Sequence, residues 1–208
     1  MATLTPSRPP VFNLPNQLTT SRLVLALVLF ALIGWESWLW SLVVFVAAAI
    51  TDWLDGYFAR KQGLVSTLGR NLDPLVDKVL ICGAYIFLLP HGIGEGWLLP
   101  WMVTVIVARE LVITSLRSFM ENRGAVFGAD WLGKLKMGLQ CAALISIFVF
   151  LWLNTPDRSA GTVWFFATVR DGLIWAMLAA TALSGLQYLW RAASLLKGDA
   201  EAMRLPQA

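Results

Sequence analysis

Four aspartates lie close together in an apolar part of the chain. The stretch TDWLDGYFARKQGLVSTLGRNLDPLVDK, residues 51–78, places Asp52, Asp55, Asp73 and Asp77 among Trp, Leu, Val, Phe and Tyr residues. Side chains three or four residues apart share one face of a helix, so the first two aspartates form one pair and the last two form another. If the pairs lie on two consecutive antiparallel helices, the four carboxylates can converge on one polar pocket.

The chemistry open to such a pocket is metal-assisted. Facing carboxylates repel each other and are costly near a bilayer unless a cation lies among them. Oxygen ligands, with no Cys or His in reach, favour Mg²⁺, Mn²⁺ or Ca²⁺ over Zn²⁺. Two such ions suit displacement at phosphorus, and one carboxylate can accept a proton from an attacking hydroxyl. The alternative interpretation is a helix junction in which the acids pair with Arg60, Arg70 and Lys78.

The composition indicates which elements must position these residues. Of the 208 residues, 58% are hydrophobic and 14% are charged, well below the roughly 25% charged residues of soluble domains. Several apolar runs reach the ~20 residues that a helix needs to cross a bilayer, and the alternating pattern of an outer-membrane barrel is missing. We therefore expect an all-α integral membrane protein.

Apolar runs and their breakers predict six transmembrane helices within one membrane domain over residues 1–208. A short amphipathic segment, LPNQLTTSR, leads into the first helix and can lengthen it, and residues 1–13 and 196–208 are expected to be flexible ends. The expected spans are residues 23–35, 38–60, 71–89, 97–119, 131–153 and 173–192. The links between them are too short to hold a soluble domain.

The distribution of basic residues predicts the orientation. If the N-terminus is cytoplasmic, every one of the 16 Lys and Arg residues except Arg158 and Arg170 falls on the inner side, as the positive-inside rule requires. Both termini and the aspartates are then cytoplasmic. The net charge of +3 suits anionic lipid headgroups rather than nucleic acid, because no basic patch with interleaved aromatic residues is present.

The aspartates belong to a longer pattern that also contains small residues and one arginine at fixed spacings. It reads Asp52-x-x-Asp55-Gly56-x-x-Ala59-Arg60, then eight residues, then Gly69-x-x-x-Asp73-x-x-x-Asp77. The small residues let a backbone or a ligand come close, which a salt-bridged junction would not need. This pattern resembles the signature of the CDP-alcohol phosphatidyltransferases. The resemblance implies a six-helix enzyme of phospholipid biosynthesis in the bacterial inner membrane, usually a homodimer, which moves a phosphatidyl group from a CDP-linked lipid to an alcohol and releases CMP.

The resemblance also implies roles for individual residues. Two divalent ions, Mg²⁺ or Mn²⁺, would be bound by Asp52, Asp55, Asp73 and Asp77. The residues expected around the CDP moiety are Asp55, Gly56, Ala59, Arg60 and Gly69. Asp77 would be the catalytic base for the acceptor hydroxyl.

The acceptor is indicated by patches outside this pattern. NLPNQLTTSR, ITDWLDGYFARK, LDPLVDK, ARELVITSLRSF and GKLKMGLQ, all within residues 13–140, resemble the phosphatidylglycerophosphate synthases of the family. That likeness implies CDP-diacylglycerol as donor and sn-glycerol 3-phosphate as acceptor. A phosphate dianion needs cations, and the candidates are Arg109, Arg117, Lys134 and Lys136. The alternative is that Lys134, Lys136 and Arg117 snorkel at the interface. For Arg109 the alternative is pairing with its neighbour Glu110.

Two other functions remain open at this point. A sister phosphatidyltransferase would share the metal site but use inositol phosphate or phosphatidylglycerol as acceptor; Arg70, Asn71 and Val76 depart from residues common in the family and weaken the acceptor assignment. A divalent-cation transporter could use the same aspartates for coordination. No role is predicted for residues 154–172.

Overall fold

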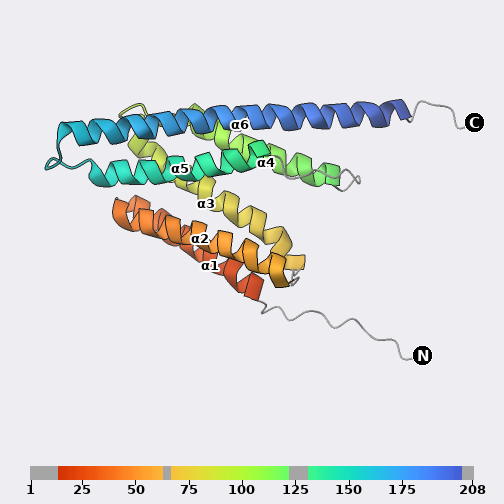
Figure 1. Cartoon of the computed structure of the whole chain (residues 1–208), viewed down its shortest axis with the longest axis horizontal. Coiled ribbons are helices and arrows are strands. Elements are labelled where there is room, and N and C mark those ends of the chain that lie inside the picture. Colours follow the sequence, from red (N-terminus) through yellow and green to blue (C-terminus); the bar gives the residue numbers. More distant parts are fainter. Residues whose placement is uncertain (1–13, 63–66, 122–130, 203–208) are drawn as a thin grey trace, which may run out of the picture. The chain divides into compact units, whose positions relative to one another are not determined.

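The computed structural model describes the backbone of residues 14–62, 67–121 and 131–202, and the side chains of residues 20–51, 75–120 and 131–194. Within these ranges every regular element is an α-helix (Figure 1). The helices are α1 (Leu14–Gly34), α2 (Trp38–Gln62), α3 (Thr67–Ile93), α4 (Pro100–Glu121), α5 (Trp131–Leu153) and α6 (Ala160–Ala202). The all-helical class predicted from the apolar runs is confirmed.

Three helical segments are long and apolar enough to cross a bilayer, which makes this a membrane protein. They are Leu75–Ile93, Trp131–Leu153 and Ala160–Ser194. The apolar parts of α1 and α2, Thr20–Gly34 and Trp38–Thr51, are shorter within the part of the chain whose side chains are described. Helix α4 is outside this group of three and carries Arg109, Glu110 and Arg117. The six expected spans therefore stay a prediction.

The helix ends differ from the expected spans most at the start of α1 and at both ends of α6, which ends at Ala202 rather than residue 192. LPNQLTTSR lengthens the first helix, because α1 runs from Leu14 to Gly34 as one helix; its amphipathic character stays a prediction. Helix α6 begins at Ala160 rather than residue 173. Its start is capped by Ser159, whose Oγ accepts a hydrogen bond of 3.3 Å from the backbone N–H of Thr162, the geometry of an N-cap.

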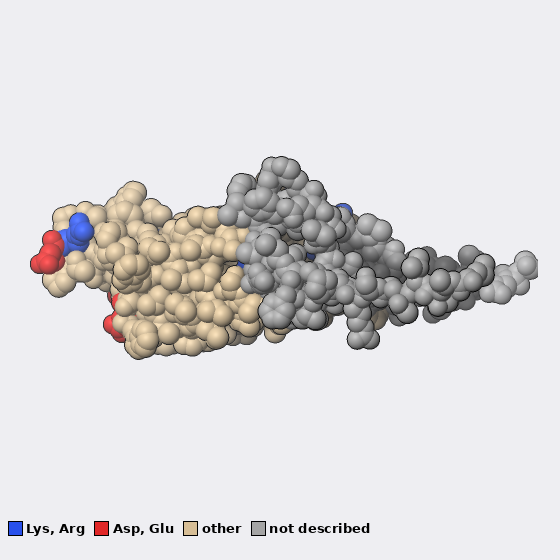
Figure 2. All heavy atoms as spheres, turned by 90° about the horizontal axis from the view of Figure 1, so that it is seen from below, with Lys and Arg blue, Asp and Glu red and all other residues tan. Residues whose placement is uncertain are grey.

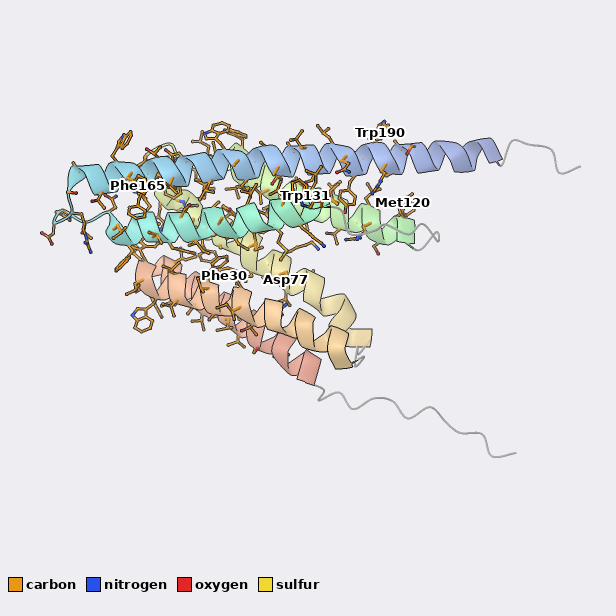
Figure 3. The ribbon with its side chains drawn as sticks, in the orientation of Figure 1. Phe30, Asp77, Met120, Trp131, Phe165 and Trp190 are labelled. Carbon is orange, nitrogen blue, oxygen red and sulfur yellow. The ribbon has the colours of Figure 1, made fainter. Side chains whose placement is uncertain are left out.

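The chain divides into two compact units, residues 1–87 and 88–208, which are described separately. In the first unit α1 packs against α2. Helix α1 also contacts α3, because the ring of Phe30 (Figure 3) stacks on Phe87 with centroids 4.9 Å apart. A Cβ atom on Gly83 would lie 2.2 Å from Cζ of Phe30. A side chain at position 83 would therefore force the ring of Phe30 to move.

In the second unit α6 packs along both α5 and α4. The buried core between these helices includes Ile106, Leu144, Ile147, Phe148 and Met177. About three turns into α6, the guanidinium of Arg170 lies over the rings of Trp97 and Phe150, at 4.7 and 4.0 Å from their centroids. Arg170 also forms ion pairs with Asp171 at 2.8 Å and Glu95 at 3.6 Å.

Large apolar side chains are also exposed on the surface of the protein. Trp164, Trp175 and Trp190 on α6 are 71%, 57% and 76% exposed, and Trp190 and Phe165 are labelled on that helix in Figure 3. On the face drawn in Figure 2, Lys, Arg, Asp and Glu are sparse over the described residues, and the clearest group lies at the left end. An extensive exposed apolar surface of this kind is typical of a protein surrounded by lipid.

Candidate active site

The four aspartates lie on the two helices that their spacing predicted. Asp52 and Asp55 fall within α2, and Asp73 and Asp77 fall within α3. The side chains of Asp52, Asp55 and Asp73 lie outside the part of the chain whose side chains are described. The same part excludes Gly56, Ala59, Arg60 and Gly69. Convergence of the carboxylates and contact with a nucleotide therefore stay predictions.

Of the four aspartates of the pattern, only Asp77 has a described side chain, and it has an arginine partner. Nη1 of Arg22, on α1, donates a hydrogen bond of 2.8 Å to Oδ1 of Asp77 (labelled in Figure 3). The Arg22 side chain is 2% exposed and that of Asp77 is 26% exposed. A buried guanidinium needs an anion to offset the loss of its hydration, and Asp77 supplies one. Helix α1 thereby fixes one oxygen of the carboxylate expected to act as base.

Sequence reasoning had treated Arg22 only as one of the basic residues on the inner side. Its position within the patch NLPNQLTTSR was the available signal, but its partner lies 55 residues away in the chain. No helical spacing relates such residues, because their contact depends on the packing of α1 against α3.

In the second unit, two of the four cations expected to bind the acceptor phosphate meet at one carboxylate. Nζ of Lys136, on α5, donates to Oε1 of Glu110 on α4. Nη1 of Arg109 donates to the same oxygen at 3.3 Å, and Nη2 of Arg109 donates to Oγ of Ser184 on α6 at 2.9 Å. The pairing of Arg109 with Glu110, left open by the sequence, is thus confirmed.

The other two expected acceptor-binding cations differ from this buried group. Lys134 is exposed one turn or less from the start of α5, and Arg117 is half-buried on α4. The sequence predicts equivalent roles for Lys134 and Lys136, but the structure separates them, since Lys136 is buried.

The residue types present suit a hard divalent cation. Among the residues with described side chains, no group of three or more His, Cys, Asp or Glu could hold a metal ion, and three of the four expected ligands are outside that part. The expected donor set is four carboxylates without thiol or imidazole. Such a set fits Mg²⁺ or Mn²⁺.

Comparison with known proteins identifies the class to which these helices and residues belong. The family model for CDP-alcohol phosphatidyltransferase matches residues 12–183, which include parts of both compact units. The chain belongs to this family and is therefore a transferase.

Two curated relatives are similar over most of their length. The first, from Bacillus subtilis (strain 168), is 33% identical over 193 residues, covering 86% of this chain and 94% of the relative. The second, from Escherichia coli (strain K12), is 33% identical over 174 residues, covering 80% of this chain and 92% of the relative. Both are named CDP-diacylglycerol–glycerol-3-phosphate 3-phosphatidyltransferase.

Proposed function

We propose that the protein transfers the phosphatidyl group of CDP-diacylglycerol to sn-glycerol 3-phosphate, giving phosphatidylglycerophosphate and CMP. The observation that carries this proposal is the similarity to two relatives named for that reaction, over 86% and 80% of this chain. The family pattern at residues 52–77 and the cationic residues of α4 and α5 support it.

In the proposed reaction, a hydroxyl oxygen of glycerol 3-phosphate attacks the phosphorus of the phosphatidyl group. The bond from that phosphorus to the CMP oxygen breaks, and CMP leaves with the electron pair. Asp77 accepts the proton of the attacking hydroxyl. Its hydrogen bond from Arg22 supports this assignment, because a base must be held in one orientation to meet the hydroxyl within hydrogen-bond reach.

In this proposal the donor is bound by the residues of the family pattern, which lie on α2 and α3. Asp52, Asp55, Asp73 and Asp77 would hold two divalent ions, Mg²⁺ or Mn²⁺, which when bound neutralise phosphate charge. Around the CDP moiety we place Asp55, Gly56, Ala59, Arg60 and Gly69. Small residues let the nucleotide approach the backbone, and the Arg guanidinium suits a pyrophosphate oxygen.

The acceptor phosphate is assigned to Arg109, Arg117, Lys134 and Lys136. A guanidinium can bind two phosphate oxygens at once, and an ammonium adds a compact charge. The meeting of Arg109 and Lys136 at Glu110 supports the proposal, because a phosphate dianion is bound best where two cations are already held together.

For the whole protein we propose a homodimer with six transmembrane helices in a bacterial inner membrane. Both termini and the aspartates would face the cytoplasm. The distribution of basic residues supports this orientation, because only Arg158 and Arg170 fall on the other side.

The test is CMP release by the purified protein in detergent, with CDP-diacylglycerol, Mg²⁺ or Mn²⁺ and one acceptor at a time. We expect metal-dependent release with glycerol 3-phosphate and not with inositol phosphate or phosphatidylglycerol. Release with another acceptor would keep the family and change the substrate. Without release for any acceptor, by protein that remains folded, the proposed reaction is wrong.

The same assay tests the assignment of Asp77. Asp77→Asn should lower kcat by at least about a hundredfold, because an amide cannot accept the proton. Asp157→Asn makes the same chemical change in the exposed α5–α6 loop and should leave kcat unchanged. An Asp77→Asn enzyme with ordinary kcat would remove Asp77 from the reaction.

A further inference from the structure

The group formed by Arg109, Glu110, Lys136 and Ser184 connects three helices of the second unit. Glu110 comes from α4, Lys136 from α5 and Ser184 from α6. The side chains of Arg109, Glu110 and Lys136 are only 13%, 10% and 6% exposed. A buried carboxylate that contacts two cations is costly to desolvate unless each contact is maintained, so this arrangement is held in place by its own electrostatics.

Helix α6 restrains the arginine from a second side. Oγ of Ser184 accepts the hydrogen bond from Arg109 and itself donates to the carbonyl oxygen of Thr181 at 3.1 Å. The stem of Arg109 lies beside the next residue, Gly185, where an added Cβ atom would be 3.4 Å from Cγ of Arg109, an ordinary contact. The guanidinium is therefore fixed at two of its nitrogens, one by a carboxylate and one by a hydroxyl.

The two cations share one carboxylate oxygen, so within this group of three charges positive charge exceeds negative charge. Such a group attracts an anion rather than a cation. Because Arg109 and Lys136 are already oriented, a phosphate that binds them would not have to order two long side chains, which would otherwise weaken binding.

We propose that Glu110 is a positioning residue for the phosphate of the acceptor: it holds Arg109 and Lys136 together as a preformed seat for a phosphate monoester. This inference rests on the proposed function and deepens it. A carboxylate alone would repel a phosphate. Beside Arg109 and Lys136, Glu110 instead sets the geometry of the two cations and limits their net charge.

The test compares Glu110→Gln and Glu110→Asp with the wild-type protein. Glu110→Gln keeps the shape but loses the charge, so the KM for glycerol 3-phosphate should rise about tenfold, the effect of losing one modest interaction. The KM for CDP-diacylglycerol should stay within about twofold. Glu110→Asp keeps the charge on a shorter stem and should recover part of the loss. Glu95→Gln, which removes an exposed ion-pair partner of Arg170, is the matched control and should change neither constant.

A purely structural role for Glu110 would give a different result. In that case the variants would lower the unfolding temperature and leave both KM values unchanged, which would overturn the inference. If Glu110→Gln does not fold, Ser184→Ala takes its place, because it removes only the hydroxyl that holds Arg109. A raised KM for glycerol 3-phosphate in Ser184→Ala supports a preformed seat, and an unchanged KM overturns it.

A binding measurement separates this inference from the reaction itself. If the wild-type protein releases no CMP with glycerol 3-phosphate, the proposed function fails, but the phosphate seat can still be measured. Glycerol 3-phosphate and inorganic phosphate should each raise the unfolding temperature of the wild-type protein, and at the same concentration should raise that of Glu110→Gln less. Equal stabilisation of both proteins, or of neither, would overturn the role of Glu110.

Discussion

At the scale of single residues, the contact between Arg22 and Asp77 carries the most weight. The family pattern contains the aspartate but not the arginine, which comes from another helix. A guanidinium at 2.8 Å from one carboxylate oxygen restricts rotation of the aspartate. The orientation of the expected base, Asp77, therefore depends on how α1 packs against α3.

This contact predicts a graded effect of substitutions at position 22. Arg22→Gln removes the charge, and Arg22→Lys keeps it but loses the planar fork. Partners that orient a catalytic group typically contribute about 10–100-fold to activity, so Arg22→Gln should lower kcat by that factor and Arg22→Lys by less. The measurement is steady-state CMP release together with the unfolding temperature. Arg191→Gln, at an exposed arginine of α6, is the control.

The outcome at position 22 distinguishes two roles. If Arg22→Gln lowers the unfolding temperature but the folded enzyme keeps its kcat, the arginine serves only the packing of α1. A lower kcat with partial recovery in Arg22→Lys supports orientation of Asp77.

The aspartates and the arginine also show what sequence could and could not predict about the site. The spacing of three and four residues placed the acids on two helices, because helical periodicity is local. The Arg22–Asp77 and Lys136–Glu110 contacts join residues 55 and 26 apart, and they depend on how helices pack, which no local pattern encodes.

At the scale of elements, apolar runs located the helices and polar or glycine-rich breakers located most of their ends. The predicted start of the sixth helix at residue 173 is wrong because Arg170 and Asp171 interrupt the apolar run, which favours a loop in the sequence pattern. In the folded protein these charges are satisfied by each other, by Glu95 and by the rings of Trp97 and Phe150. Tertiary partners thus allow the helix to begin at Ala160.

The contact between α1 and α3 gives a prediction about helix packing. Gly83→Ala would place Cβ 2.2 Å from Phe30, so the ring must leave its stack on Phe87. Overpacking of this kind costs about 1–3 kcal/mol, and the unfolding temperature in detergent should fall accordingly. Adding Phe30→Leu should recover part of the loss, since the smaller side chain makes room.

Gly138→Ala is the matched control for this packing prediction. Gly138 lies on α5, and nothing lies within 4 Å of the position of an added Cβ. Because alanine favours helix by up to about 1 kcal/mol relative to glycine, this variant should be as stable as the wild type or more so. Equal stability of Gly83→Ala and Gly138→Ala would show that the close approach at Phe30 is not required.

At the scale of the whole molecule, the length of α6 bears on the orientation in the membrane. The helix has 43 residues, which corresponds to about 65 Å at 1.5 Å per residue, whereas the hydrocarbon core is ~30 Å thick. Part of α6 must therefore lie outside the core. Its C-terminal part carries Arg191, Lys197 and Asp199, so that end is the part expected to leave the bilayer, on the cytoplasmic side if the positive-inside rule holds.

This orientation can be measured with two reporter cysteines in the same region of the chain. Asp157→Cys lies in the exposed loop before α6, and Ser194→Cys is exposed near the other end of that helix. In intact bacteria, a membrane-impermeant maleimide should label Asp157→Cys, while Ser194→Cys should react only after the membrane is permeabilised. The wild-type protein, whose Cys82 is buried and Cys141 half-buried, measures the background. The reverse labelling pattern would place the aspartates on the outer face. CDP-diacylglycerol and glycerol 3-phosphate on the cytoplasmic side could not reach them there. That result would therefore contradict both the proposed topology and the proposed reaction.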